Sequence, residues 1–210
     1  MLRIETNTIG IYQFDMWAAT PLTHGVFSRQ GGISQAPYTG LNLGGTVGDV
    51  PDAVAENHRR AYASLGLDAA RACTVWQVHG ADTVIANGPT PNRKWINRAD
   101  GMVTNQPGVP LMMRFADCVP LLFFDPVQHV IGIAHAGWRG TLNGAQTSVI
   151  ETMQSAFGSQ PADIQVGIGP SIGPDDYQVG EEVVAQVRES FGSTDGLIQR
   201  ATDGSAYLDL

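Results

Sequence analysis

The sequence predicts an α+β fold, a single domain in which mixed β-sheets are covered by helices. Short apolar runs rich in Val, Ile, Phe and Met recur along the 210 residues, and three other stretches show helical periodicity. Several strand-like runs follow one another through short turns, which favours a mixed sheet over a doubly wound parallel one. Glycine and proline are spread between the runs without a tandem repeat, so one domain is expected over residues 1–210.

Each predicted element has a local signal. Strands are expected at 73–78, 82–86, 101–104, 110–116, 119–124, 129–135 and 164–168. Helices are expected at about 52–65, 141–157 and 180–191. Pro51 precedes the first helix, whereas Gly158 and Gly192 follow the other two. Proline at the start and glycine at the end are the residues that helix termini favour.

Composition excludes several classes of partner. Twenty acidic residues against 12 basic ones give a formal net charge of −8, which is the opposite of a nucleic-acid-binding footprint. No run approaches the ~20 apolar residues that a membrane-spanning helix needs, and the N-terminus has no basic region followed by an apolar one. We therefore expect a cytoplasmic protein that binds neither nucleic acid nor membrane. Cys73 and Cys118 are the only cysteines and are expected to be free thiols.

A predicted β-hairpin brings Cys118 and His135 together. The runs 119–124 and 129–134 flank Asp125-Pro126, a pair that type I turns prefer. If Phe124 faces His129, then Cys118 lies directly opposite His135, and facing side chains have Cβ atoms ~4.5–5.5 Å apart. His79 ends a separate strand and is expected to join them from a neighbouring edge.

Three interpretations of these side chains stay open at this point. Two imidazoles and a thiol are three zinc ligands, and the fourth position is then free for water or substrate. The same geometry suits a Cys118 nucleophile with His135 or His79 as its base. Isolated His and Cys residues are also often ordinary buried groups. That third interpretation is preferred for Cys73, His129, His24 and His58, the last being expected on a helix surface.

Three further residues are candidates for a site. Asp117 precedes Cys118 and is interpreted as a proton carrier or as an acceptor that holds a loop. Arg139 lies where the helix 141–157 begins, which suits an anion such as phosphate or else a salt bridge on a turn. The segment Phe27–Ser34 offers Arg29 beside two glycines, as an anion cradle or as a tight turn. It lacks the lysine and the spacing of a P-loop.

With these residues in place, the chain resembles the YfiH-type family, long labelled polyphenol oxidoreductase laccases and associated with purine nucleoside phosphorolysis. The similarity runs from about Phe27 to Glu182. The matching strings are Ser28–Ser34, Leu41–Gly44, Gln77–Gly80, Ala99–Thr104, Ala116–Pro120, His135–Gly140 and Gly169–Gly173.

The resemblance implies a specific chemistry. In such proteins two histidines and one cysteine bind a single zinc, a role that falls here to His79, Cys118 and His135. The family is implied to cleave adenosine, inosine, guanosine and methylthioadenosine with phosphate and to deaminate adenosine. The catalytic residues are then expected to be Asp117, Cys118 and Arg139, with Arg29, Asn42 and Arg139 binding substrate or phosphate. The implied fold is a layered α/β/β/α arrangement akin to putative cysteine hydrolases.

Two departures from the family pattern matter. Relatives usually continue beyond Leu210, so we expect a member that is short at its C-terminus. Gln178 stands where a glutamate is usual. Both departures favour a binding protein without catalysis as one competing function.

Two enzymatic functions also compete with phosphorolysis. One is that of a cysteine hydrolase or amidase acting on a small amide or cell-wall precursor, and the other is that of a copper-binding polyphenol oxidase. Five histidines are too few for a four-copper cluster, although a single copper in the zinc site stays open as the cofactor. The sequence predicts no oligomeric state.

Overall fold

A computed structural model describes residues 1–6, 8–90 and 94–210 and divides them into two compact units. The first unit comprises Met1–Ala72 with the described part of Pro89–Arg93, and the second comprises Cys73–Gly88 and Lys94–Leu210. The predicted combination of mixed β-sheets with helices is confirmed. That the whole chain forms a single domain stays a prediction.

The first unit is an antiparallel three-stranded sheet with one long helix. Its elements are β1 (Leu2–Thr6), β2 (Ile9–Gln13), β3 (Val26–Phe27) and α1 (Pro51–Ser64), with short 3-10 helices at Asp15–Trp17 and Ala69–Arg71. A small core of Ile9, Ile11, Leu41 and Ala61 joins β2 to α1. Burial of these apolar side chains is the main stabilising contribution to the unit.

Asn57 connects α1 to the loop that precedes it. Its side chain is fully buried, and its Oδ1 accepts a hydrogen bond of 2.8 Å from the Ile33 N–H. Its Nδ2 donates to the Ser34 hydroxyl (2.8 Å), the Asn42 carbonyl (2.9 Å) and the Gly40 carbonyl (3.2 Å). The loop therefore depends on one side chain for several of its polar contacts.

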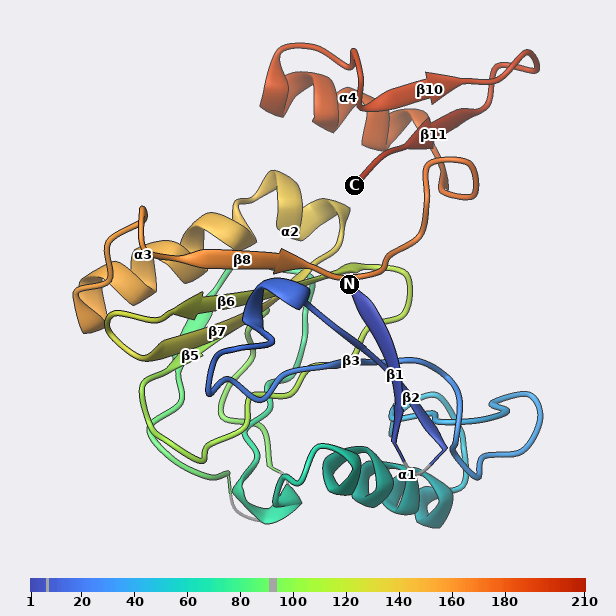
Figure 1. Cartoon of the computed structure of the whole chain (residues 1–210). Helices are drawn as coiled ribbons and strands as arrows, with labels where there is room; N and C mark the ends of the chain where they lie inside the picture. The colour runs from blue at the N-terminus through green and yellow to red at the C-terminus, as the bar shows by residue number, and fades with distance from the viewer. Residues whose placement is uncertain (7, 91–93) are drawn as a thin grey trace. The chain divides into compact units, whose positions relative to one another are not determined.

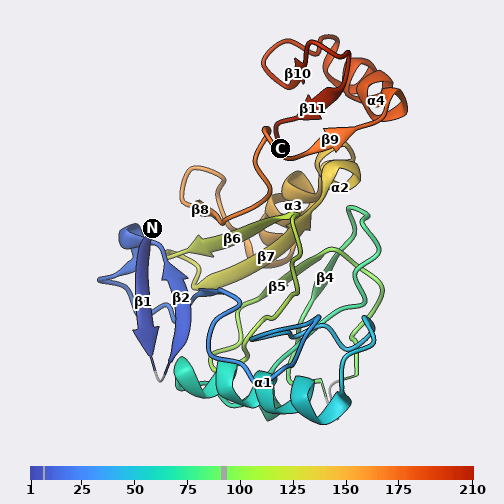
Figure 2. The same cartoon turned by 90° about the vertical axis from the view of Figure 1, so that its right-hand side faces the viewer.

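The second unit is organised by a five-stranded sheet of order β4-β5-β7-β6-β8. The strands are β4 (Thr83–Ile85), β5 (Gly101–Thr104), β6 (Val119–Asp125), β7 (Val130–Ala136) and β8 (Gln165–Ile168). Only the β4–β5 pair is parallel. Helix α3 (Ala145–Phe157) packs on β7 and β5, as Figures 1 and 2 show. Val149 and Met153 of α3 are fully buried in the core of this face.

The predicted β6–β7 hairpin exists, but its predicted register is wrong by two residues. Asp125 pairs with Val130 and Pro120 pairs with His135, so Cys118 lies just before the ladder rather than opposite His135. The turn has four residues, as predicted, but it lies one position later along the chain, at 126–129, where the Asp125 carboxylate accepts hydrogen bonds from the Val127 and Gln128 N–H groups. A slip of two residues leaves every side chain on its expected face.

Three other predicted elements differ from the structure. The runs 73–78 and 110–116 form only isolated bridges, such as Cys73 with Leu111. The helix predicted at 141–157 is instead α2 (Trp138–Leu142) followed by α3. The two are separated at Gly144, whose φ of 81° is a left-handed conformation that a helix cannot contain. Arg139 therefore lies inside α2, not before a helix start.

A small third sheet completes the second unit. It has the order β10-β11-β9, with β9 (Gln178–Val179), β10 (Ile198–Arg200) and β11 (Ala206–Leu208). Helix α4 (Glu181–Phe191) supplies Val183 and Val187 to its core, against which Trp138 and Leu142 of α2 pack. None of the described helices has the length and apolar character needed to cross a membrane.

Candidate metal centre

The structure brings His79, Cys118 and His135 together. One ligand atom from each residue lies within 4.8 Å of the ligand atoms of the other two. The two imidazole rings have centroids 4.8 Å apart at an angle of 72°. All three residues belong to the second unit, and they are the only such group of three found among residues 1–6, 8–90 and 94–210.

His79 reaches the cluster from a loop with unusual backbone geometry. Its φ is 58°, in the left-handed region that residues other than glycine seldom adopt. The N–H groups of Val78, His79 and Gly80 all donate to the Asp100 carboxylate, at 3.0, 3.1 and 2.7 Å. Successive N–H groups that converge on one anion stabilise such a turn.

His135 is the buried member of the cluster. It lies near the end of β7, and its backbone N–H donates to the Asp100 carbonyl at 2.8 Å. Its Nδ1–H donates to the Asp100 carboxylate, also at 2.8 Å, and the Phe115 ring lies 5.5 Å from its own. The other ring nitrogen, Nε2, is therefore the one left for a metal or a proton.

Cys118 lies directly before β6 and is half-buried. Asp117, just before it, has a φ of 74°, and its carbonyl accepts a hydrogen bond of 2.9 Å from the Ile172 N–H. Asp117 therefore lies outside the regular ladder of β6, and its side chain is exposed. Gly137 lies so close that a Cβ on it would be 2.9 Å from the Cys118 Sγ.

The four ionisable groups at the centre influence one another. Burial lowers the pKa of His135, but its hydrogen bonds and charge attraction with Asp100 and Cys118 outweigh burial and raise it to about 9. Desolvation, with repulsion from His135 and Arg139, lowers the pKa of His79. Desolvation raises the pKa of Asp100, but hydrogen bonds from His135 and the loop reverse the effect and lower it. A deprotonated Asp100 beside His135 follows from these directions.

Two further side chains act on the cluster through their charges and dipoles. The guanidinium of Arg139 is exposed and lies 4.4 Å from the centroid of the Trp138 ring, a cation–π contact. Tyr177 is half-buried, and burial together with the charge of Cys118 raises its pKa. Arg139 and Asp117 also act on Tyr177. These groups therefore lie within electrostatic range of the cluster.

Two predicted substrate-binding residues belong to the first unit. Arg29 is exposed, and its carbonyl accepts a hydrogen bond of 2.7 Å from the Leu41 N–H. Asn42 donates from Nδ2 to the Asp49 carboxylate at 2.8 Å and accepts from the Gly44 N–H at 3.0 Å. Both residues shape the Phe27–Ser34 region and its neighbouring loop. Their roles in binding phosphate stay predictions.

His24, His58 and Cys73 have local hydrogen-bond partners. His24 accepts a hydrogen bond of 2.8 Å from the Phe14 N–H, and the Cys73 thiol donates to the Gly88 carbonyl at 2.7 Å. His58 was expected on a helix surface but is buried, with its Nε2 3.0 Å from the Leu43 carbonyl. The prediction for His58 was wrong because it faces the loop that α1 covers.

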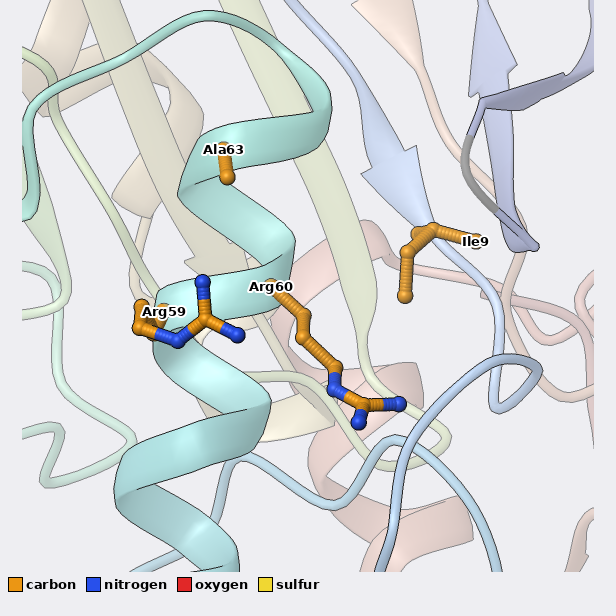
Figure 3. Close-up of a pocket in the computed structure, with 4 residues that line it drawn as sticks. All are labelled: Ile9, Arg59, Arg60 and Ala63. Atoms are coloured by element: carbon orange, nitrogen blue, oxygen red, sulfur yellow. The ribbon is translucent and has the colours of Figure 1, made fainter.

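A pocket beside α1 shares no lining residue with this cluster. It is lined by Ile9, Arg59, Arg60 and Ala63, and Figure 3 shows both guanidinium groups extending from the helix. Both arginines already form ion pairs with Glu56, at 2.6 and 2.8 Å. Both guanidinium groups therefore use hydrogen-bond donors on Glu56, and Arg60 donates a further hydrogen bond of 3.1 Å to the Gly31 carbonyl.

The donor set fits a metal ion of the zinc class. Two imidazole nitrogens and one thiolate sulfur are its usual ligands, and bond lengths of ~2.0–2.3 Å put tetrahedral ligand atoms roughly 3.4–3.6 Å apart. The 4.8 Å limit on the observed spacing is compatible with small side-chain adjustments. The buried Asp100–His135 pair is the carboxylate–histidine arrangement common behind metal ligands.

Sequence reasoning missed the role of Asp100. In the sequence it is only one residue of a matching string, because it lies 21 residues after His79 and 35 before His135. A carboxylate in an Ala-Asp-Gly sequence directly before a fully buried strand is a usable signal, since such a group must find donors. Tyr177, next to the unusual Gln178, was not predicted as a neighbour of the cluster.

Comparisons with known proteins agree with this architecture. The chain is 40% identical over 182 residues to "Purine nucleoside phosphorylase ORF3" of Streptomyces griseus, covering 87% of this chain and 72% of the relative. It is 41% identical over 187 residues to "Purine nucleoside phosphorylase" of Deinococcus radiodurans, a match that covers 89% of this chain and 70% of the relative. The crystal structure of the hypothetical protein YfiH of Bacillus licheniformis matches with a TM-score of 0.87 and 29% identity. The match covers 99% of this chain and 79% of that structure's chain.

A family model matches most of the chain and identifies its family. Residues 23–210 match the family described as "Multi-copper polyphenol oxidoreductase laccase". The match contains all three residues of the cluster together with Asp100, Asp117 and Arg139. By this match and by its relatives, the chain belongs to the multi-copper polyphenol oxidoreductase laccase family, whose YfiH-type members it resembles in sequence and in fold.

Proposed function

We propose that this protein is a metal-dependent purine nucleoside phosphorylase, with zinc at His79, Cys118 and His135. The observation that carries the proposal is the His-Cys-His cluster itself, backed by Asp100, in a chain about 40% identical to proteins named purine nucleoside phosphorylase. When bound, a zinc ion with an open fourth position supplies a Lewis acid beside the substrate.

Phosphorolysis needs a group that holds phosphate and a group that carries a proton. A phosphate oxygen forms a bond to C1′ of the ribose, the C1′–N9 bond breaks, and its electron pair leaves with the purine, which takes up a proton. Arg139, exposed and always charged, is suited to holding phosphate. Asp117 is an exposed carboxylate beside Cys118 and is suited to carrying the proton. Arg29 and Asn42 are the further phosphate contacts we expect.

The proposed substrates are adenosine, inosine, guanosine and methylthioadenosine, with deamination of adenosine as a second activity. Deamination needs an activated water and a proton carrier, and Asp117 serves the second need. Tyr177 lies within electrostatic range of Cys118 and Arg139, which makes its phenol a further candidate for contact with the substrate.

The test is a phosphate-dependent assay of purified zinc-loaded protein over these four nucleosides. Free base and ribose 1-phosphate are expected only when phosphate is present, and inosine is expected from adenosine if deamination occurs. Cys118→Ala should lose both the metal and the activity. Release of no base from any of the four nucleosides by fully metallated protein would contradict the proposal.

A second candidate, a cysteine hydrolase or amidase, is favoured by one observation. A side-chain hydrogen bond with Cys118 is one of the contacts that raise the pKa of His135 to about 9, which places a cationic imidazole beside the thiol. Alkylation by iodoacetamide separates the two candidates. A thiol bound to zinc is protected after zinc is added, whereas a free nucleophile reacts quickly at neutral pH whether or not zinc is present.

The family's description also suggests a polyphenol oxidase with several copper ions. The single three-residue group found in the described part of the chain supplies ligands for one ion. Elemental analysis of protein purified without added metal tests this candidate, because it counts zinc and copper per chain directly. We expect one zinc.

A further inference from the structure

Asp100 is the residue that touches both histidines of the centre. Its side chain has no exposed surface. Oδ1 accepts hydrogen bonds from the His135 Nδ1–H (2.8 Å) and the His79 N–H (3.1 Å). Oδ2 accepts from the Gly80 N–H (2.7 Å) and the Val78 N–H (3.0 Å). Both oxygens of one buried carboxylate are therefore fully used by the two segments that carry the imidazoles.

The contact with His135 selects the nitrogen that binds metal. An ionised carboxylate only accepts hydrogen bonds, so Nδ1 must carry the proton. In the neutral ring the lone pair then lies on Nε2, the nitrogen that is free for the cluster. A second hydrogen bond, from the His135 backbone N–H to the Asp100 carbonyl, also holds these two residues together.

The contacts with the loop fix the position of His79. A non-glycine residue at φ 58° persists only when its surroundings impose that conformation. Three successive N–H groups that donate to one carboxylate impose it here. The resulting turn directs the His79 ring to 4.8 Å from the His135 ring, measured between centroids.

We propose that Asp100 is the positioning residue of the metal centre: it fixes both imidazoles in their binding arrangement before any metal arrives. This inference rests on the proposed function in one respect, namely that His79, Cys118 and His135 bind the metal. Asp100 acts through the two histidines and not on the substrate.

The first test compares zinc affinities in competition with a chromophoric chelator. Asp100→Asn keeps one acceptor oxygen but replaces the other with an NH₂ group that cannot accept, so it should weaken zinc binding roughly 10–100-fold. Asp125→Asn is the matched control. Asp125 is also fully buried and accepts two backbone N–H bonds, but at the opposite end of β6 from Cys118. Its zinc affinity should be unchanged.

A double-variant comparison separates the two routes. If Asp100 acted through His135 alone, Asp100→Asn would have no effect on zinc affinity in a His135→Ala background. We expect it still to weaken binding severalfold there, because the loop with His79 loses its acceptor. No effect in that background would overturn the claim that Asp100 positions both histidines.

A measurement on the unmodified protein removes the risk that Asp100→Asn does not fold. Amide hydrogen exchange is followed for Val78, His79 and Gly80 in zinc-free and zinc-loaded protein. We expect protection already without zinc, and free exchange until zinc is added would overturn the inference. Failure of the unmodified protein to bind zinc at all would instead count against the proposed function, because the amides report on Asp100 independently of the metal.

Discussion

At the scale of one residue, the backbone of Gly137 lies close to two of the three residues in the metal centre. A methyl group there would lie 2.9 Å from the Cys118 Sγ and 3.3 Å from the His79 Cδ2. Its backbone, at φ −76° and ψ 174°, is one that alanine adopts without strain. Gly137→Ala should therefore fold normally yet displace two ligands, lowering zinc affinity about 10-fold or more, as chelator competition would show.

Gly173→Ala is the matched control for this change. A Cβ at Gly173 meets no atom within 4 Å, so the same added methyl group should leave zinc affinity unaltered. Both variants are compared by thermal unfolding as well. Equal zinc affinities for Gly137→Ala and the unmodified protein would mean that the ligands do not need the spacing that the structure shows.

At the scale of one helix, Asn57 of α1 is expected to contribute to the free energy of unfolding. Asn57→Ala leaves the Ile33 N–H, the Ser34 hydroxyl and the Asn42 carbonyl without this partner, and it opens space beside α1. Buried groups that lose their partners cost about 1–3 kcal/mol each when nothing replaces them. We expect the free energy of unfolding to fall by about 2–4 kcal/mol, measured by urea denaturation. A loss below about 1 kcal/mol would mean that water replaces the amide.

The elements differ in how far the sequence could predict them. Helix α1 and α4 were predicted closely because Pro51 and Gly192 mark helix ends. The meeting of Cys118 with His135 was predicted despite the wrong register, since a slip of two residues preserves the faces of both strands. The loop at His79 was not predictable, because its conformation depends on Asp100, a partner 21 residues away with no periodic signal.

At the scale of the whole molecule, the cluster concentrates metal chemistry in one of the two units. His79, Cys118, His135 and Asp100 all lie in the second unit, whereas α1 and the first sheet belong to the other. This division was not predicted, because the first unit is discontinuous in sequence: it combines Met1–Ala72 with the described part of Pro89–Arg93, whereas linker signals mark the ends of continuous segments. Any stabilisation by a metal should therefore be unevenly distributed along the chain.

Zinc binding should stabilise the second unit selectively. A ligand that binds only the native state adds about 2.7 kcal/mol at 100 times its dissociation constant, or roughly 5–10 °C in Tm for a chain of this size. Hydrogen exchange with zinc and with chelator should show the gain in β6 and β7 and little change in α1. Cys118→Ser should abolish most of the shift, because the hydroxyl is a far weaker zinc ligand than the thiolate. Equal gains in α1 and β7 would mean instead that the two units unfold as one cooperative body, so that metal bound at Cys118 stabilises the whole chain.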